Sequence, residues 1–382
     1  MKILYTNYHK GDGGGHTTYL STLIRQLGGL HNLTLAVPAS SRLYRDSSLA
    51  GMSRKVAVEY SSRIWRTPAL VARLKALMEA ERFHIVHVNG PLDHRCVMLA
   101  RMRMRGPRPR IVYTKHDNHE ISGLGARLRA GLGTDQVIAV CDDTARRLRA
   151  SPYARCPIST IKNGVDTEYY RPRPPSDSPV WPIPIRGRLV IGSNAGTADY
   201  KNWLHMVEAV ALLPRHLREQ ALVAVAGQPP SAAQLARIQE LDMMGQVYYA
   251  GLLTDVRPFV AEFDLGFVLS SRIETISFAC REMMAMGKPV MVSRYAGLPE
   301  NIDDGVNGWL VKPSSPQDIA QCLTRILAQR PRLDAMSQEA RAKSVAEFGV
   351  QGFVAQTQQL YADLLAAQNV HHATITSPQG AK

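Results

Sequence analysis

A run of prolines divides the chain into two halves that carry the same pattern of strands and helices. Between Tyr170 and Gly187 the sequence reads YRPRPPSDSPVWPIPIRG, and its six prolines cannot lie inside a regular helix or sheet. On each side of this segment, short apolar runs alternate with stretches of helical period. Such alternation is typical of buried parallel strands joined by crossover helices. We therefore expect an α/β protein built from two doubly wound, Rossmann-like domains.

The position of the prolines also predicts how the chain is divided. Its 382 residues are enough for two domains, since roughly 100–200 residues per domain is usual. We expect a first domain over 1–170, a proline-rich linker over 171–186, a second domain over 187–349, a long amphipathic helix over about 350–368 and a flexible polar tail over 370–382. Ligands of such domains are expected in a cleft at the carboxyl ends of the strands.

The cysteines and the hydropathy pattern indicate a protein of the reducing cytoplasm. The cysteines are odd in number, far apart and without a CxxC pair, which argues against a zinc site or a disulfide framework. No stretch approaches the roughly 18 apolar residues of a membrane span, and the N-terminus is too polar for a signal peptide. The five cysteines are Cys96, Cys141, Cys156, Cys280 and Cys322.

The net charge of +14 and the pI near 9.7 call for an anionic partner or surroundings. Aromatic residues make up only 7% of the chain and are not interleaved with the basic ones, which argues against a single-stranded nucleic acid. An anionic membrane surface is the favoured partner, and solvated helix faces are the alternative. The basic residues gather in the first half, at Arg101, Arg103, Arg105, Arg108, Arg110, Arg127, Arg129, Arg146, Arg147 and Arg149.

Two glutamates in the segment SRIETISFACREMMAMGKPVMVS give the strongest functional signal. Glu274 follows an expected strand over 265–269, and Glu282 lies in the helix that comes next and ends at Gly287. The backbone amides of Thr275–Phe278 then form a helix N-terminus, which attracts phosphate. A carboxylate in the first turns of that helix can accept hydrogen bonds from a ribose diol.

This segment resembles the retaining GT-B glycosyltransferases of the family-4 type, which have two glutamates at this spacing before an Ala-Met-Gly-Pro-like run. The resemblance implies two Rossmann-like domains facing across a cleft, with the last helix crossing back to the first domain. It implies that Glu282 binds the ribose and that Glu274 lies near the donor sugar and phosphates. The same donor site would include Arg272, Thr275, Ile276 and Ser277. Thr275 and Ser277 replace glycines that are usual in the family.

A glycine-rich turn after the first expected strand is a second signal. It is not a dinucleotide fingerprint, because His16 occupies the third glycine position and no acidic residue follows the second strand. The resemblance implies that Gly14 and Gly15 pack against the donor diphosphate. A plain tight turn is the alternative.

Further matches to the family lie in both halves. The resemblance places His116 and Asp117, which follow a strand, near the donor sugar, and it makes Lys201 a clamp for the diphosphate. The partner arginine of that clamp is Gly196 here, and Arg272 is our candidate to replace it. The segment over 295–311 resembles a family turn and short hairpin, with a structural role.

The resemblance and the absence of an Asp-x-Asp motif predict a metal-independent, retaining sugar transfer that needs no cofactor. The donor would be a nucleotide diphosphate-sugar, with UDP or GDP expected, and the acceptor a glycan or glycolipid at the inner face of the cytoplasmic membrane, as in lipopolysaccharide synthesis. Three alternatives stay open at this stage: a sugar-nucleotide epimerase, an NAD-dependent oxidoreductase, and a non-catalytic membrane-associated partner subunit.

Overall fold

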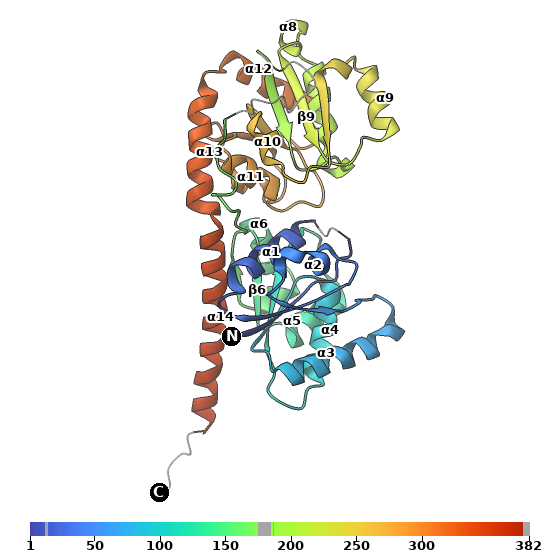
Figure 1. Cartoon of the computed structure of the whole chain (residues 1–382), viewed down its shortest axis with the longest axis vertical. Helices are drawn as coiled ribbons and strands as arrows, with labels where there is room; N and C mark the ends of the chain where they lie inside the picture. Colours follow the sequence, from blue (N-terminus) through green and yellow to red (C-terminus); the bar gives the residue numbers. More distant parts are fainter. Residues whose placement is uncertain (12–13, 175–184, 186, 377–382) are drawn as a thin grey trace. The chain divides into compact units, whose positions relative to one another are not determined.

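A computed structural model describes residues 1–11, 14–174, 185 and 187–376 (Figure 1). The contacts divide the chain into two compact units: residues 1–162 with 351 onward, and residues 163–350. The division falls between Lys162 and Asn163 rather than after residue 170, so the segment 163–170 belongs with the second unit. Most of the expected linker, residues 175–184 and 186, lies outside the described residues.

Within the described residues, the first unit contains a seven-stranded parallel sheet of order β3-β2-β1-β4-β5-β6-β7. Its strands are β1 (Lys2–Thr6), β2 (Asn32–Val37), β3 (Arg54–Ala57), β4 (Ile85–Val88), β5 (Arg110–Lys115), β6 (Gln136–Ala139) and β7 (Ile158–Thr160). Its helices are α1 (Gly14–Leu27), α2 (Arg42–Arg45), α3 (Thr67–Glu81), α4 (Pro91–Met102), α5 (Gly123–Leu132), α6 (Asp142–Arg149) and α14 (Val350–Thr376).

The central strands of this sheet are buried on both faces. Side chains of α3, α4, α5 and α6 join one face in a single core, and α3 and α4 run side by side (Figure 1). On α1, Tyr19 contacts Phe353 of α14 at 5.2 Å between ring centroids. The hydroxyl of Tyr361, further along α14, donates to Tyr5 of β1 at 3.3 Å. The last helix therefore packs on the first sheet, as the family resemblance implies.

The second unit repeats the plan, with six parallel described strands in the order β10-β9-β8-β11-β12-β13. Its strands are β8 (Leu189–Ser193), β9 (Ala221–Ala226), β10 (Val247–Gly251), β11 (Leu265–Val268), β12 (Val290–Ser293) and β13 (Gly308–Val311). Its helices are α7 (Trp203–Ala211), α8 (Arg215–Arg218), α9 (Ala232–Glu240), α10 (Arg257–Ala261), α11 (Phe278–Ala285), α12 (Pro316–Ala328) and α13 (Arg332–Phe348).

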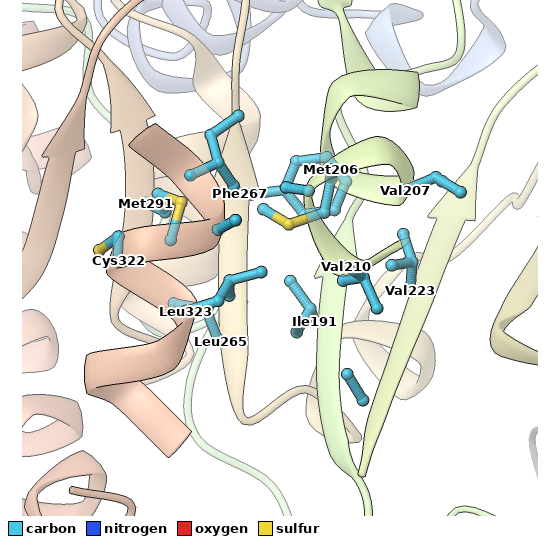
Figure 2. Packing of buried hydrophobic residues seen from close by; sticks show 14 of the residues in the cluster. Ile191, Met206, Val207, Val210, Val223, Leu265, Phe267, Met291, Cys322 and Leu323 are labelled. Atoms are coloured by element: carbon cyan, nitrogen blue, oxygen red, sulfur yellow. The ribbon is translucent and has the colours of Figure 1, made fainter. Parts of the chain in front are cut away.

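Helices cover both faces of the second sheet. Figure 2 shows one side, where Met206 and Val210 of α7 and Leu323 of α12 meet Ile191 and Phe267 of the strands. Side chains of α10, α11 and α13 form the core on the other side. Two doubly wound units, each with the strand order of a dinucleotide-binding fold, confirm the predicted fold class.

Some expected segments differ in the structure. The segment over 295–311 is not a hairpin: β13 runs parallel to β12, so it is the edge strand of the sheet. Helix α14 continues to Thr376, so it includes residues 370–376 of the expected polar tail, and 377–382 lie outside the described residues. No helix in the described part of the chain is both long and apolar enough to span a membrane.

A buried polar network joins α14 to the first sheet. The ring of His87 on β4 is hydrogen-bonded through Nδ1 to the Tyr361 hydroxyl at 2.5 Å and through Nε2 to Thr114 at 2.6 Å. Burial lowers the pKa of His87 to about 3, so the ring is neutral at physiological pH. Because a buried polar group must keep its partners, this network fixes how α14 docks.

We expect Tyr361→Phe to lower the stability of the first unit by about 1–3 kcal/mol, because His87 loses a buried partner. Denaturant unfolding followed by circular dichroism measures this change. Tyr169→Phe is the control, because Tyr169 is exposed and its substitution should leave stability unchanged. A Tyr361→Phe variant as stable as the control would show that the network does not hold α14.

Candidate donor site and comparison with known proteins

The candidate donor site of the second unit lies where its strand order reverses. Strands β8 and β11 are neighbours although four α-helices and two strands separate them in sequence. The chain leaves β8 toward β9 on one side and leaves β11 toward β12 on the other, and open α/β sheets bind their ligands at such a reversal, beyond the carboxyl ends of the strands. The loop after β8 carries Asn194 and Lys201, and the loop after β11 carries Glu274.

Lys201 and Glu274 form a largely buried ion pair at this edge. The Lys201 Nζ lies 2.6 Å from Glu274 Oε2, and the hydroxyl of Ser270 donates to the same oxygen at 3.2 Å. The neighbouring Asn202 ties the two loops together, since its Nδ2 donates to Leu269 O at 3.1 Å and to Ser271 Oγ at 2.6 Å. The structure therefore brings together the lysine and the first glutamate that the sequence proposed.

Glu282 lies on α11 and points to the end of β8. The Nδ2 of Asn194 donates to Glu282 Oε2 at 2.8 Å, and the hydroxyl of Tyr170 also donates to this carboxylate. Burial raises the pKa of Glu282 to about 6, while these two hydrogen bonds act in the opposite direction. The Oδ1 of Asn194 is buried and has no hydrogen-bond partner among the described residues. The site thus presents the Glu282 carboxylate beside the amide oxygen of Asn194. These two hydrogen-bond acceptors match the two hydroxyl donors of a ribose diol.

The N-terminus of α11 carries the other proposed donor-binding residues. Ser277 caps the helix, since its side chain accepts from the Cys280 amide at 3.4 Å, and its φ is 53°. A left-handed backbone costs a residue with Cβ about 1–2 kcal/mol, which explains why a glycine is usual there. Thr275 and Ile276 are buried beside it. The helix ends with Gly287 at φ 73°, as the sequence predicts.

The position of the missing arginine has a backbone conformation that favours glycine. Gly196 has φ 90°, and a Cβ added there would meet nothing within 4 Å, so strain rather than space opposes a side chain. Arg272, the proposed replacement, is exposed in the loop after β11, two residues before Glu274. Its role in phosphate binding stays a prediction.

In the first unit, His116 follows β5 and lies at the corresponding edge. Its Nε2 contacts Asn89 Oδ1 at 2.8 Å, and the amide nitrogen of Asn89 donates to Thr6 O at 3.0 Å. The Nε2 of His116 therefore carries the proton. Burial, together with the neighbouring His16, holds the pKa of His116 well below its usual value, so the ring is neutral. The rings of His16 and His116 lie 4.3 Å apart.

Asp117 points to a different set of partners. Its Oδ1 accepts from Lys115 Nζ at 2.5 Å and from the backbone amide of His119 at 2.9 Å. Burial opposes ionisation of Asp117, but Lys115 and these hydrogen bonds bring its pKa below the usual value. A cavity of about 380 Å³ lies against this pair, lined by Lys115, Asp117, Asn118, His119, Glu120, Ile121, Thr144, Arg147, Leu148, Ala150 and Ser151.

The glycine-rich turn leads directly into α1. The helix begins at Gly14, whose φ of 52° is a backbone conformation that glycine adopts without strain, and Gly15 is exposed in its first turn. Contact of these glycines with a diphosphate stays a prediction. Among the described residues, no group of three or more His, Cys, Asp or Glu side chains is arranged to hold a metal ion.

Two family models match the chain. Residues 13–169 match the model described as Glycosyltransferase Family 4, and residues 186–343 match the model described as Glycosyl transferases group 1. The chain belongs to the family-4 type GT-B glycosyltransferases. Membership in this family favours a glycosyltransferase over the epimerase, the oxidoreductase and the non-catalytic subunit that the sequence left open.

Relatives and solved structures agree with this assignment. The glycosyltransferase is 25% identical over 306 residues to N-acetyl-alpha-D-glucosaminyl L-malate synthase of Bacillus anthracis, with 78% of this chain and 79% of that protein covered. It is 28% identical over 175 residues to the lipopolysaccharide core biosynthesis glycosyltransferase LpsE of Rhizobium meliloti, covering 46% and 47%. The crystal structure of Anabaena Alr3699/HepE in complex with UDP superposes with a TM-score of 0.80, at 19% identity, covering 95% of this chain and 100% of that chain.

Sequence reasoning missed three residues that the structure places at these edges. Asn194 follows β8 directly, and Asn89 follows β4 directly, so a search for polar residues at strand ends would have found both. Tyr170 carried no such signal, because it lies beside the proline-rich segment, far from Glu282 in sequence.

We expect Glu274→Gln to tighten the binding of a nucleoside diphosphate by about threefold, because Lys201 is released and a negative charge is removed. Lys201→Met should weaken binding instead. Calorimetric titration measures both, and Glu240→Gln, an exposed glutamate of α9, is the control. Weaker binding by Glu274→Gln would indicate that Glu274 positions Lys201 for the diphosphate rather than competing with it.

Proposed function

We propose that this glycosyltransferase moves a hexose from a UDP- or GDP-sugar to a hydroxyl of a glycan or glycolipid, with retention of anomeric configuration and without a metal ion. The observation that carries the proposal is the edge at β8 and β11, where Lys201 pairs with Glu274 and Asn194 donates to Glu282. The likeness in fold to a protein solved with UDP supports a nucleotide donor.

The chemistry follows from the charges at this edge. Lys201 would pair with the diphosphate in place of Glu274, and the amides at the N-terminus of α11 would stabilise the charge that develops as the diphosphate leaves. Glu274, released from Lys201, would accept hydrogen bonds from the donor sugar. The acceptor hydroxyl would attack from the side of the leaving group, and a departing phosphate oxygen would take its proton.

We assign the acceptor to the first unit, where His116 and Asp117 lie. Because the His116 ring is neutral and its Nε2–H is held by Asn89, its side chain is suited to hydrogen bonding rather than to carrying charge. The likeness to LpsE supports a lipopolysaccharide-type or other surface glycan. An acceptor of this kind would place the enzyme at the inner face of the cytoplasmic membrane.

Helix α5 supports membrane contact better than the basic cluster does. Arg101 and Arg110 both pair with Asp135, which neutralises part of that cluster. On α5, three leucines at a spacing of four residues are exposed: Leu124 by 72%, Leu128 by 42% and Leu132 by 47%. This spacing places them on one face of the helix. An apolar stripe on a helix that also carries arginines is typical of a surface that binds anionic lipid.

The donor prediction is tested by calorimetric titration with UDP, GDP, ADP and NAD. We expect micromolar binding of UDP or GDP, and at least tenfold weaker binding by Glu282→Ala, because a charged hydrogen-bond acceptor is lost. Glu240→Ala is the matched control. Binding of NAD alone, or of no nucleotide, would refute the donor assignment. With an active donor and acceptor pair, EDTA should leave turnover unchanged and NMR should show an unchanged anomeric configuration.

The membrane prediction is tested by flotation with vesicles that contain an anionic phospholipid. We expect the wild-type protein to float with them, and a Leu124→Ser/Leu128→Ser variant to bind at least tenfold less, because apolar surface is lost. Leu235→Ser removes an exposed leucine of α9 and serves as control. Equal binding by both variants would remove α5 from the proposal.

A further inference from the structure

The segment that precedes the proline-rich stretch is fixed to the helix that carries Glu282. The guanidinium of Arg341 on α13 donates to Thr167 O at 2.7 Å, to Tyr170 O at 3.1 Å and to Ala285 O at 2.8 Å. Ala285 is the last residue of α11, so one side chain joins this segment to the end of that helix. Asp166 closes the turn, since its backbone carbonyl accepts from the Tyr170 amide at 2.8 Å.

This anchoring places the Tyr170 hydroxyl on the Glu282 carboxylate. The hydroxyl donates to the carboxylate, and the Asn194 amide donates to Oε2 of the same group at 2.8 Å. A carboxylate can accept about four hydrogen bonds, so these two donors leave capacity for a diol. The buried, unpartnered Oδ1 of Asn194 adds an acceptor at the same place.

We propose that Tyr170 is a positioning residue for donor binding: its hydroxyl orients the Glu282 carboxylate so that this group and Asn194 Oδ1 receive the two ribose hydroxyls. The inference rests on the proposed function, since it concerns the same nucleotide. It adds that the segment before the linker, rather than the Rossmann-like fold alone, contributes to the nucleoside site.

The electrostatics of the contact agree with this role. Burial raises the pKa of Glu282 to about 6, and the hydrogen bonds from Asn194 and Tyr170 oppose that rise. Burial and the Glu282 charge together raise the pKa of Tyr170, which therefore stays a hydrogen-bond donor at physiological pH. Asp255 and Arg257 are charged groups near the Tyr170 hydroxyl, and Cys280 and Arg281 are titratable neighbours of Glu282 on its own helix. Loss of the hydroxyl should thus raise the pKa of Glu282 further.

The test substitutes Tyr170→Phe, which keeps the ring and its packing. Binding of a UDP- or GDP-sugar is titrated by calorimetry between pH 5 and pH 8, because such a diester has no phosphate ionisation in that range. We expect wild-type affinity to fall as the pH drops through about 6. In Tyr170→Phe, the affinity at pH 7.5 should fall roughly three- to tenfold. The further loss of affinity on acidification should begin at a higher pH than in the wild-type protein.

Three further variants make the result specific. Tyr169→Phe is the matched control, because Tyr169 is the adjacent tyrosine and presents its ring, not its hydroxyl, to Arg257 at 3.6 Å. Glu282→Gln should bind weakly at all pH values, and Tyr170→Phe added to it should cause no further loss. A 2′-deoxy nucleotide should be affected less by Tyr170→Phe than the ribonucleotide is. Thermal unfolding shows that each variant is folded.

Two failures are distinguishable. If the wild-type protein binds no nucleoside diphosphate-sugar, or if Glu282→Ala binds as well as wild type, the proposed function fails. If wild type binds and Glu282→Ala does not, but Tyr170→Phe keeps the affinity and pH profile of Tyr169→Phe, the role of Tyr170 is refuted. The role of Tyr170 would also be refuted if Tyr170→Phe lowered the affinity equally in the wild-type protein and in the Glu282→Gln variant. The hydroxyl would then act independently of the carboxylate.

Discussion

The arrangement of the donor edge depends on one buried cation, the guanidinium of Arg281. It is fully buried, donates to the backbone carbonyl of Asn163 and to Asn301 Oδ1, and lies over the ring of Phe348 at 4.1 Å. A charge can remain in such a place only if several groups surround it in a fixed geometry. Arg281 thereby joins four parts of the second unit: Asn163, which is the first residue of the unit, helix α11, the turn at Leu298–Asn301 and the end of α13. Glu282 is the next residue on α11, so its position is set by the same contacts.

In both units, a reversal of the strand order brings polar groups together. In each sheet the strand order reverses between two neighbours, β1 and β4 in the first and β8 and β11 in the second. Loops that leave such a pair in opposite directions leave backbone groups and side chains exposed at the carboxyl edge. The two edges differ in charge. The second holds Lys201 and two carboxylates, which fits the proposed nucleotide, whereas the first holds neutral histidine rings beside the Lys115–Asp117 pair, which fits the proposed hydrogen bonding to a sugar.

The buried strands and helices of the fold could be predicted closely from the sequence, and three of the strands at the sheet edges could not. The strand expected over 265–269 is β11 (Leu265–Val268), because a buried parallel strand is almost wholly apolar, and the helix expected to end at Gly287 is α11, because a glycine after the last turn is a clear stop signal. The edge strand β13 was misread as part of a hairpin, and the edge strands β3 and β7 carry no clear strand signal in the sequence. All three lie at sheet edges and are short and partly exposed, and β3 and β7 also lack a continuous apolar run.

What the sequence by itself determined is local: two alternations of strand and helix, the cap at Gly287, and two glutamates at a spacing that spans a strand end and a helix. Only the tertiary structure decided which groups meet. Lys201 and Glu274 are 73 residues apart in sequence, and Asn194 and Glu282 are 88 apart. They come together because β11 pairs with β8 rather than with β10, its predecessor in the chain. Tyr170 joins them for a similar reason, since Arg341 and Arg281 hold its segment to α11. The strands pair in this order because helices must cover both faces of the sheet at the same time, and a local pattern of residues does not specify that arrangement.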